Sequence, residues 1–467
     1  MEYAKVTEET ITELNMMVGP TSIVTKKEDM EKYSHDESPT KYAAFPEVVV
    51  KPQNTEQVSR ILTLANKKGI PVTLRGQGTG LSSAAVPNLG GVLISFENMN
   101  RILEIDEDNL VAVVEPGVIL LHLRQELEKR GLFYPADPGE PSSAIGGNIS
   151  TNAGGMNGVK YGNTRGHVLG LEIVLPSGEI LNLGGKTFKR SSGYELMHLI
   201  VGSEGTLAAV TKITLKLIKL PKFFITLYIP YENLHDAIRS VPEIIRRKIT
   251  PTAIEFVEKD YLLMVEEHLN KTMPQHDAQA YLILRIDGDS NDELYKIGED
   301  VTNICLENNA RDVLVADTRE TQERIWSIRS GFYEAAVHKG VQKVVDTVVP
   351  PSKIAEYIEK VKNISHAYSI RILSVGHAGD GNIHLILMRG DLIDGAWNER
   401  CEKAMMELYQ TALGLGGTIS GEHGIGIDKK EYLAMGIDRK ELEIMKGIKR
   451  VFDQNNIMNP GKIFDMD

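Results

Sequence analysis

Cysteine is nearly absent from this sequence. The chain of 467 residues has two cysteines, Cys305 and Cys401, and no C-x-x-C pair. A disulfide framework or a thiolate metal site needs several cysteines at short spacing. Neither is supported, so any metal site must use His, Asp, Glu or Asn side chains.

Long hydrophobic runs are also missing. Stretches such as Val48–Val50 and Ile213–Leu220 are short or interrupted by lysine, whereas a membrane span needs about 20 apolar residues. The first ten residues, MEYAKVTEET, carry acids where a signal peptide would carry bases followed by an apolar run. We expect no membrane span and a cytoplasmic protein.

No segment concentrates basic residues. The formal charge is −12, from 64 acidic and 52 basic residues, and a nucleic-acid partner would require a basic stripe. We therefore expect no nucleic-acid partner. The composition that is present, 42% apolar and 25% charged residues, is that of a folded globular protein, and the length predicts two domains.

The order of the expected elements predicts an α+β fold. Residues 47–74 read as strand, helix and strand, with a capping pair at Asn54 and Gln57 and a helix end at Gly69. Pro221 marks the expected domain boundary. Further helices are expected at 118–130, 291–308, 353–364 and 398–413, and further strands at 91–96, 110–114, 171–175, 179–183, 213–217, 225–229, 280–285 and 372–375.

A glycine-rich loop, RGQGTGLSS, follows the strand that ends at Leu74. Glycines at alternate positions allow consecutive backbone N–H groups to point at one centre, which suits a phosphate. The loop lacks the Gly-Lys-Ser/Thr of a P-loop, and its third glycine comes one residue early for a dinucleotide-binding fingerprint. A plain glycine-rich turn is the alternative.

A second glycine-rich stretch covers residues 138–155, with the sequence PGEPSSAIGGNISTNAGG. Its small residues are too numerous to pack a core, and their pattern is too regular for a linker. We expect this stretch to lie along an extended ligand.

Two further motifs, GHAGDGNIH at 376–384 and SGEHGIG at 420–426, carry histidines and an acid. His377 and His384 would lie on opposite faces of a straight strand, but the Gly-Asp-Gly between them permits a tight loop that brings both rings together. Two histidines and Glu422 form a three-ligand set that leaves positions open, as catalytic divalent sites do. Histidines held in a glycine loop by local hydrogen bonds, without a metal, are the alternative.

Taken in order, these motifs resemble one known family. They are joined by VEPGV, YGNTRGHVLGLEIVLPSGEIL and GSEGTLAAVTKITLKL, and the likeness runs from about Pro46 to the end of the chain. The sequence is similar to FAD-binding proteins of the vanillyl-alcohol oxidase type, in the branch of glycolate oxidase flavoprotein subunits and D-lactate and D-2-hydroxyglutarate dehydrogenases.

The resemblance implies a domain plan. It consists of an N-terminal helical extension (1–40), a two-subdomain FAD-binding domain (41–220), an α+β substrate domain with a metal site (221–450) and a C-terminal segment (451–467) that returns to the FAD domain. It also implies the residues that bind FAD: Arg75, Gly76, Gln77, Gly78, Thr79, Gly80, Leu81, Ser82, Pro138, Ser142, Gly146, Gly147, Asn148, Ser150, Thr151, Gly155, Glu204 and Gly205. The first loop lacks the histidine that tethers the flavin in some relatives, so we expect non-covalent FAD.

The resemblance further implies an active site for oxidising a small 2-hydroxy acid. His377, His384 and Glu422 would bind a divalent metal (Zn, Mn or Fe), and His423 would be the general base. The base would take the hydroxyl proton while the hydride passes to the flavin. Arg329, in a W-x-x-R motif, would bind the substrate carboxylate as a bidentate fork.

The expected substrate contacts are Arg329, Asn382, Tyr333 and Lys343. D-2-hydroxyglutarate dehydrogenases carry Thr where this chain has Tyr333 and Asn where it has Ile386, and Lys343 is out of step with their lysine. The side chains that would bind a second, distal carboxylate of the substrate are thus missing or displaced. This favours D-lactate or glycolate as the substrate.

The expected electron acceptor is a separate protein, such as an electron-transferring flavoprotein or an iron–sulfur subunit, because the chain has no cluster motif. Three alternatives remain open. They are a non-redox transferase of the same fold, of the alkylglycerone-phosphate synthase type, an electron-relay flavoprotein subunit, and a zinc hydrolase using the same ligands.

Overall fold

The computed structural model describes residues 2–38, 42–340 and 342–466. The chain divides into two compact units: unit 1 contains Met1–Ala153, Asn163–Leu220 and Glu422–Asp467, and unit 2 contains Gly154–Gly162 and Pro221–Gly421. The boundary after Leu220 lies where Pro221 was expected to mark one. The chain returns to unit 1 at Glu422, earlier than the expected position 451.

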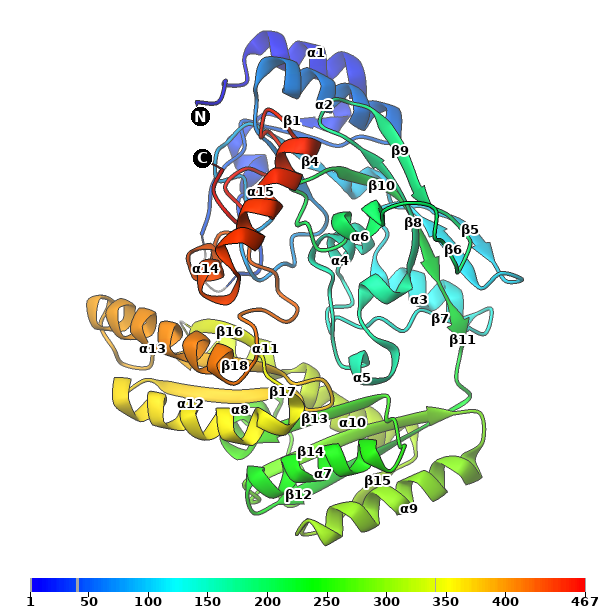
Figure 1. The fold of residues 1–467 in the computed structure, drawn as a ribbon, viewed down its shortest axis with the longest axis vertical. Helices are drawn as coiled ribbons and strands as arrows, with labels where there is room; N and C mark the ends of the chain where they lie inside the picture. The colour runs from blue at the N-terminus through cyan, green and yellow to red at the C-terminus, as the bar shows by residue number, and fades with distance from the viewer. Residues whose placement is uncertain (1, 39–41, 341, 467) are drawn as a thin grey trace. The chain divides into compact units, whose positions relative to one another are not determined.

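Unit 1 is built on two main sheets in the residues described (Figure 1). In the four-stranded sheet, β4 lies between β2 and β3 and is parallel to both, and β1 pairs with β2 in the antiparallel sense. The five-stranded sheet is antiparallel, in the order β5-β6-β10-β8-β9. The strands are β1 Ile23–Val24, β2 Val48–Val50, β3 Val72–Arg75, β4 Val92–Ser95, β5 Ile102–Asp106, β6 Val111–Val114, β8 Val168–Val174, β9 Ile180–Gly184, β10 Ala209–Lys216, and the separate pair β7 Leu132–Phe133 and β11 Ile218–Lys219.

Helices of unit 1 begin and end at capping residues where the sequence provides them. Helix α2 starts after Asn54, whose Oδ1 accepts the Gln57 N–H at 2.9 Å, and ends at Gly69 in the left-handed conformation. Its apolar face, Val58, Ile61 and Leu62, is buried. The helices are α1 Glu8–Val18, α2 Thr55–Lys68, α3 Leu120–Glu128, α4 Ile145–Thr151, α6 Leu196–Ile200, α14 Leu433–Gly436 and α15 Arg439–Phe452.

The second glycine-rich stretch differs from expectation. Residues 145–151 form helix α4, and both Ile145 and Ile149 are buried in the core of unit 1. The expectation that this stretch is too rich in small residues to pack a core is wrong for this part. The isoleucines fall four residues apart, on one helical face, and that face is enough to bury the segment.

The C-terminal segment packs against the four-stranded sheet. The Val72 N–H donates to the Ile457 carbonyl and the Asn459 N–H donates to the Val72 carbonyl, both at 2.7 Å. The buried ammonium of Lys449 donates to the carbonyls of Thr206 and Met458. The predicted return of the C-terminus to this domain is confirmed.

Unit 2 contains a fully antiparallel seven-stranded sheet in the part of the chain described, in the order β15-β12-β14-β13-β17-β18-β16. The strands are β12 Phe223–Tyr231, β13 Ala253–Glu258, β14 Ala280–Gly288, β15 Leu314–Ala316, β16 Gln342–Val348, β17 Arg371–His377 and β18 Asn382–Met388.

Helices cover both faces of this sheet (Figure 1). Side chains of α8, α10 and α11 form one core with Leu373, Val375 and Ile386 of β17 and β18, and we call this the α8 face. Thr347 of β16 points to the other face, where its hydroxyl bonds to Tyr357 of α12 at 3.1 Å. The helices are α5 Gly158–Tyr161, α7 Leu234–Arg246, α8 Lys259–Leu269, α9 Asn291–Glu307, α10 Arg319–Ser330, α11 Phe332–Lys339, α12 Ile354–Tyr368 and α13 Asp394–Gly414. No helix among the described residues has the length and apolar character to cross a membrane.

Candidate active site

The two histidines of the GHAGDGNIH motif lie on one hairpin of unit 2. His377 ends β17 and pairs with Asn382, while His384 on β18 pairs with Val375. Residues directly opposite one another in an antiparallel pair share a face, so both imidazoles lie on the α8 face. The predicted turn that brings them together is confirmed: the two Nε2 atoms are 3.4 Å apart.

A buried carboxylate lies behind each imidazole. Glu255 Oε1 lies 2.7 Å from His377 Nδ1, and Asp346 Oδ1 lies 3.7 Å from His384 Nδ1. Both carboxylates are completely buried. Because the Glu255 carboxylate accepts a hydrogen bond from His377 Nδ1, the lone pair of a neutral His377 ring lies at Nε2, where a metal binds.

This arrangement fits a divalent metal. Two nitrogens that each lie at about 2.0–2.1 Å from a tetrahedral zinc are about 3.4 Å apart, which matches the separation of the two Nε2 atoms. Lone pairs facing each other at that distance repel unless a cation or a proton lies between them. The donor chemistry is that of Zn, Mn or Fe sites.

Asp346 also organises the segment that leads to Glu422. Its Oδ2 accepts the Ser420 hydroxyl at 2.9 Å and the Gly421 N–H at 3.0 Å. Its Oδ1 accepts the Asn382 amide at 2.7 Å. Asn382 Oδ1 is buried and has no donor among the described residues, so this predicted substrate residue keeps an acceptor for a ligand.

Arg329 lies near the end of α10 and is tied to Glu255. Its Nε donates to Glu255 Oε2 at 2.5 Å, and the guanidinium lies 5.4 Å from the centre of the Phe332 ring. Burial would raise the pKa of Glu255, but the charges and hydrogen bonds of Arg329 and His377 outweigh it and lower that pKa. Arg329 therefore belongs to the same hydrogen-bonded network as His377.

The other two predicted substrate residues are placed differently. Tyr333 lies one turn after Arg329, half-buried at the start of α11. Lys343 pairs with Leu387, and Asp346 pairs with His384. Since side chains alternate along a strand, Lys343 lies on the α12 face with Thr347, opposite the histidines. That placement argues against a substrate contact for Lys343.

Glu422 and His423 begin the last segment of unit 1. The Ser82 hydroxyl donates to the carbonyls of His423 and Gly424, at 2.9 and 3.1 Å. Glu204 accepts the N–H groups of Ile425 and Gly426, each at 2.7 Å, and its burial raises its pKa. Ser82 and Glu204, predicted to bind FAD, thus fix the backbone around His423.

The first glycine-rich loop fits an anion. Among the described residues, none of the backbone N–H groups from Gln77 to Ser82 donates to another protein group. Arg75 is used differently from the expectation: both terminal nitrogens donate to main-chain carbonyls, of Lys32 and His35. The backbone of Gly78, at φ +75°, packs directly against this guanidinium. Arg75 therefore supports the loop by packing against it.

The second glycine-rich stretch lies against the first within unit 1. A Cβ on Gly76 would be 2.9 Å from Ala144 Cβ, whereas a Cβ on Gly147 would meet nothing within 4 Å. Asn148 Nδ2 is buried without an acceptor among the described residues. These two loops therefore offer unused donors and open space together, as an FAD site requires.

The remaining predicted cofactor residues have local partners or other positions. The exposed Ser142 hydroxyl donates to Glu140, and the hydroxyls of Ser150 and Thr151 donate to carbonyls one turn earlier in α4. Pro138 is half-buried, Gly205 adopts φ +69° beside Leu74, and Gly155 lies in the segment that belongs to unit 2.

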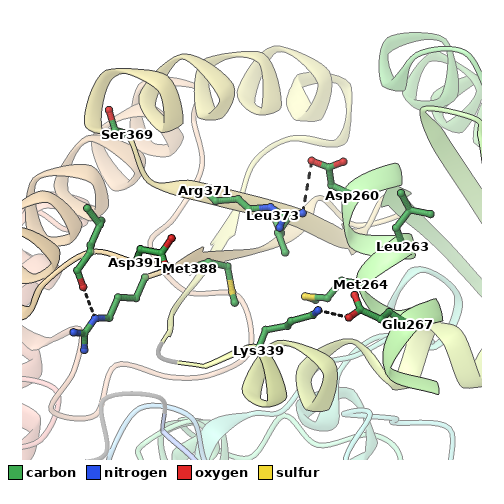
Figure 2. A pocket seen from close by; sticks show the side chains of 13 residues that line it. Asp260, Leu263, Met264, Glu267, Lys339, Ser369, Arg371, Leu373, Met388 and Asp391 are labelled. Carbon is green, nitrogen blue, oxygen red and sulfur yellow. Dashed lines mark hydrogen bonds and ion pairs between the residues drawn. The ribbon is translucent and has the colours of Figure 1, made fainter. Parts of the chain in front are cut away.

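A separate pocket of about 580 Å³ lies at the other end of the β17–β18 hairpin (Figure 2). Met264, Leu373 and Met388 line it, and its cations face acids: Lys339 with Glu267 at 2.6 Å and Arg371 with Asp260 at 3.9 Å. Arg371 and His377 are the two ends of β17, so this pocket is distinct from the histidine site.

Sequence reasoning missed Glu255 as a site residue. A signal existed, because a lone acid interrupts the apolar strand sequence AIEFV. Such an acid in a buried strand calls for a partner.

These features define the class of the protein: an α+β fold with glycine-rich loops that fit an anion in one unit and a histidine pair in the other. Residues 46–184 match the family described as FAD binding domain, and residues 220–463 match the family described as FAD linked oxidases, C-terminal domain. The chain belongs to the FAD-linked oxidase family.

Similar proteins span nearly the whole chain. A D-lactate dehydrogenase of Anaerostipes hadrus is 43% identical, covering 99% of this chain and 98% of the relative. The glycolate oxidase subunit GlcD of Bacillus subtilis (strain 168) is 39% identical over the same shares of both chains. A D-lactate dehydrogenase of Archaeoglobus fulgidus is 41% identical and covers 93% of this chain and 95% of the relative.

Solved structures support the predicted vanillyl-alcohol oxidase-type fold. p-Cresol methylhydroxylase with substrate bound aligns with a TM-score of 0.80 at 18% identity, covering 98% of both chains. An alkyldihydroxyacetonephosphate synthase aligns with a TM-score of 0.77 at 18% identity, covering 98% of this chain and 87% of the synthase. At this identity the likeness concerns the fold alone.

Proposed function

We propose that this protein is an FAD-dependent dehydrogenase of a small D-2-hydroxy acid, with D-lactate or glycolate as the substrate. The observation that carries the proposal is the pair of imidazole Nε2 atoms 3.4 Å apart, with a buried carboxylate near the Nδ1 atom of each ring. The full-length likeness to a D-lactate dehydrogenase and to a glycolate oxidase subunit supports the substrate class.

We assign His377, His384 and Glu422 as the metal ligands. Glu422 follows Gly421 directly in the chain, and Asp346 holds the Gly421 N–H. When bound, the metal supplies a Lewis acid that lowers the pKa of the substrate hydroxyl. The FAD, bound non-covalently by the two glycine loops, supplies the hydride acceptor.

The protein side chains then bind the substrate and move one proton. Arg329 keeps its two terminal nitrogens for the substrate carboxylate, since only its Nε–H donates to Glu255. His423, whose backbone Ser82 and Glu204 fix, accepts the hydroxyl proton.

The electrons then leave through a separate protein acceptor, an electron-transferring flavoprotein or an iron–sulfur subunit. Motif reasoning supports this, because Cys305 and Cys401 are both buried and far apart in sequence, which does not suit a cluster.

The test is anaerobic stopped-flow mixing of the purified protein with D-lactate, L-lactate, glycolate and D-2-hydroxyglutarate. Flavin absorbance near its visible maximum reports reduction. We expect rapid bleaching with D-lactate or glycolate and slow or no bleaching with the other two. Bleaching by none of the four, in a protein that holds FAD and metal, would contradict the proposal.

The matched variant is His423→Asn, which removes the base and keeps a polar side chain. We expect flavin reduction to slow by about 10²–10⁴-fold, the usual contribution of a general base, with FAD content unchanged. Reduction at the wild-type rate would remove His423 from the mechanism.

A further inference from the structure

Glu255 is a charged residue in the middle of an apolar sheet. It lies on β13 between Ile254 and Phe256, and its side chain is completely buried. Burying a carboxylate is strongly unfavourable unless its oxygens are fully paired. Both oxygens of Glu255 are paired, one with His377 and one with Arg329.

We propose that Glu255 is a positioning residue that sets the metal-binding tautomer of His377 and, with its second oxygen, orients the Arg329 guanidinium. The inference rests on the proposed function, since it concerns how a metal ligand and the substrate-binding arginine are held. It assigns a role to a residue outside every motif of the sequence.

The tautomer follows from the donor and acceptor chemistry. An ionised carboxylate can only accept, so the contact of 2.7 Å between Oε1 and Nδ1 requires the proton on His377 Nδ1. The lone pair of the neutral ring then lies on Nε2, the atom that faces His384 Nε2 at 3.4 Å. Without Glu255, either ring nitrogen could carry the proton, and a fraction of the protein would present an N–H to the metal.

The orientation of the Arg329 guanidinium follows from its contact with the second oxygen of Glu255. Arg329 meets Glu255 Oε2 through Nε alone, so the edge formed by its terminal nitrogens keeps the fork geometry that a ligand carboxylate needs. Since α10 and β17 are far apart in sequence, one carboxylate between them fixes the distance between the arginine and the histidine.

The experiment compares Glu255→Leu with Glu266→Leu. Leucine removes both acceptors at similar volume. Glu266 is a matched control, because it is also a buried carboxylate of unit 2 that accepts a backbone N–H, from Met273 at 2.5 Å, and faces a histidine ring nitrogen, of His276 at 3.3 Å. Neither Met273 nor His276 belongs to the proposed site.

Two readouts apply to metal-free protein. Long-range ¹⁵N–¹H spectra of histidine-labelled protein report the tautomer of His377, assigned by the signal that disappears in His377→Asn. Competition with a chelating dye reports the dissociation constants for Zn²⁺ and Mn²⁺. We expect the Nδ1–H tautomer and tight binding in wild type and Glu266→Leu, and in Glu255→Leu a tautomer shift with about 10–100-fold weaker binding.

The outcomes separate this inference from the proposed function. A Glu255→Leu variant that keeps the Nδ1–H tautomer and binds Zn²⁺ and Mn²⁺ within twofold of wild type would overturn the role of Glu255 and leave the proposed function intact. A wild-type protein that binds neither ion would overturn the proposed function and this inference with it. Should Glu255→Leu fail to fold because Arg329 is left as a buried charge, Glu255→Leu combined with Arg329→Met removes that charge and permits both measurements.

Discussion

At the scale of single residues, unit 1 contains a carboxylate whose environment disfavours its charge. Asp36 is 7% exposed; its Oδ1 accepts the Ser38 N–H at 3.0 Å, and its Oδ2 has no partner among the described residues. Burial raises the pKa of Asp36 to about 7; the Ser38 N–H and Arg75 oppose this rise, and Asp428 adds to it. Oδ2 lies 3.5 Å from the place that a Cβ on Gly80 would take, so it faces the anion-binding loop.

The raised pKa of Asp36 predicts how the stability of the folded protein changes with pH. The pKa of Asp36 in the folded state, about 7, lies above its ordinary value of 3.8, so the folded protein binds more protons than the unfolded chain between these values. The stabilisation is complete below about pH 4 and is lost as the pH rises to about 7. Asp36→Asn keeps the neutral form at every pH.

We therefore expect Asp36→Asn to gain stability over wild type between pH 5 and pH 8, by at most about 1.4 kcal/mol per pH unit. Urea unfolding of both proteins at pH 5, 6, 7 and 8 measures the difference. Since all other groups are shared, a difference that stays constant over this range would contradict the assignment.

At the scale of elements, the β17–β18 hairpin determines the distance between the histidines. Its turn contains Gly381 at φ +88°, and a Cβ there would lie 1.9 Å from the Val349 carbonyl oxygen. The Gly381 N–H also donates to the His377 carbonyl at 2.9 Å. A side chain at this position must therefore distort the hairpin.

We predict that Gly381→Ala destabilises the protein by about 2–5 kcal/mol, from left-handed strain and overpacking together, and abolishes tight binding of Zn²⁺. Gly390→Ala is the control: Gly390 follows the same strand, has φ +55° and would have nothing within 4 Å of its Cβ. It should lose about 1–2 kcal/mol from strain alone and bind Zn²⁺ normally. Calorimetric unfolding and dye competition provide the two measurements, and equal losses in both variants would refute the role of the turn.

Local elements were largely predictable from the sequence. The expected helix at 54–69 is α2 with the cap at Asn54, and the expected turn between His377 and His384 is present, because capping residues and glycine turns act over a few residues. Strand β5, at Ile102–Asp106, was missed: Glu104 and Asp106 give it little apolar character. Helix α4 was missed because its glycines hide the two isoleucines that bury it.

The order of strands was not predictable, and the site depends on it. Glu255 reaches His377 because β13 lies beside β17, although 122 residues separate the two in sequence. Likewise Asp346 faces His384 because β16 lies beside β18. The same register places Lys343 on the opposite face, which its spacing from the motifs could not reveal. Local patterns identify the acids but not the strands that become their neighbours.

At the scale of the whole molecule, the two units contribute different chemistry. The FAD-binding family match, residues 46–184, lies mainly in unit 1, while His377 and His384 lie in unit 2. The chain passes from unit 2 to unit 1 between Gly421 and Glu422, immediately before the proposed base. Flavin retention and metal retention should therefore be separable properties.

We predict that dialysis against a strong chelator removes the metal and leaves FAD bound, because the donors we assign to FAD, the Gln77–Ser82 amides and Asn148, are not metal ligands. Metal content by mass spectrometry and flavin absorbance after gel filtration measure the two separately. Reduction of the flavin by substrate should fall by at least about 100-fold, since the substrate hydroxyl keeps its high pKa without the metal, and should return on adding Mn²⁺ or Zn²⁺. Loss of flavin along with the metal, or unchanged reduction in its absence, would show that the histidine pair does not serve the catalytic role proposed for it.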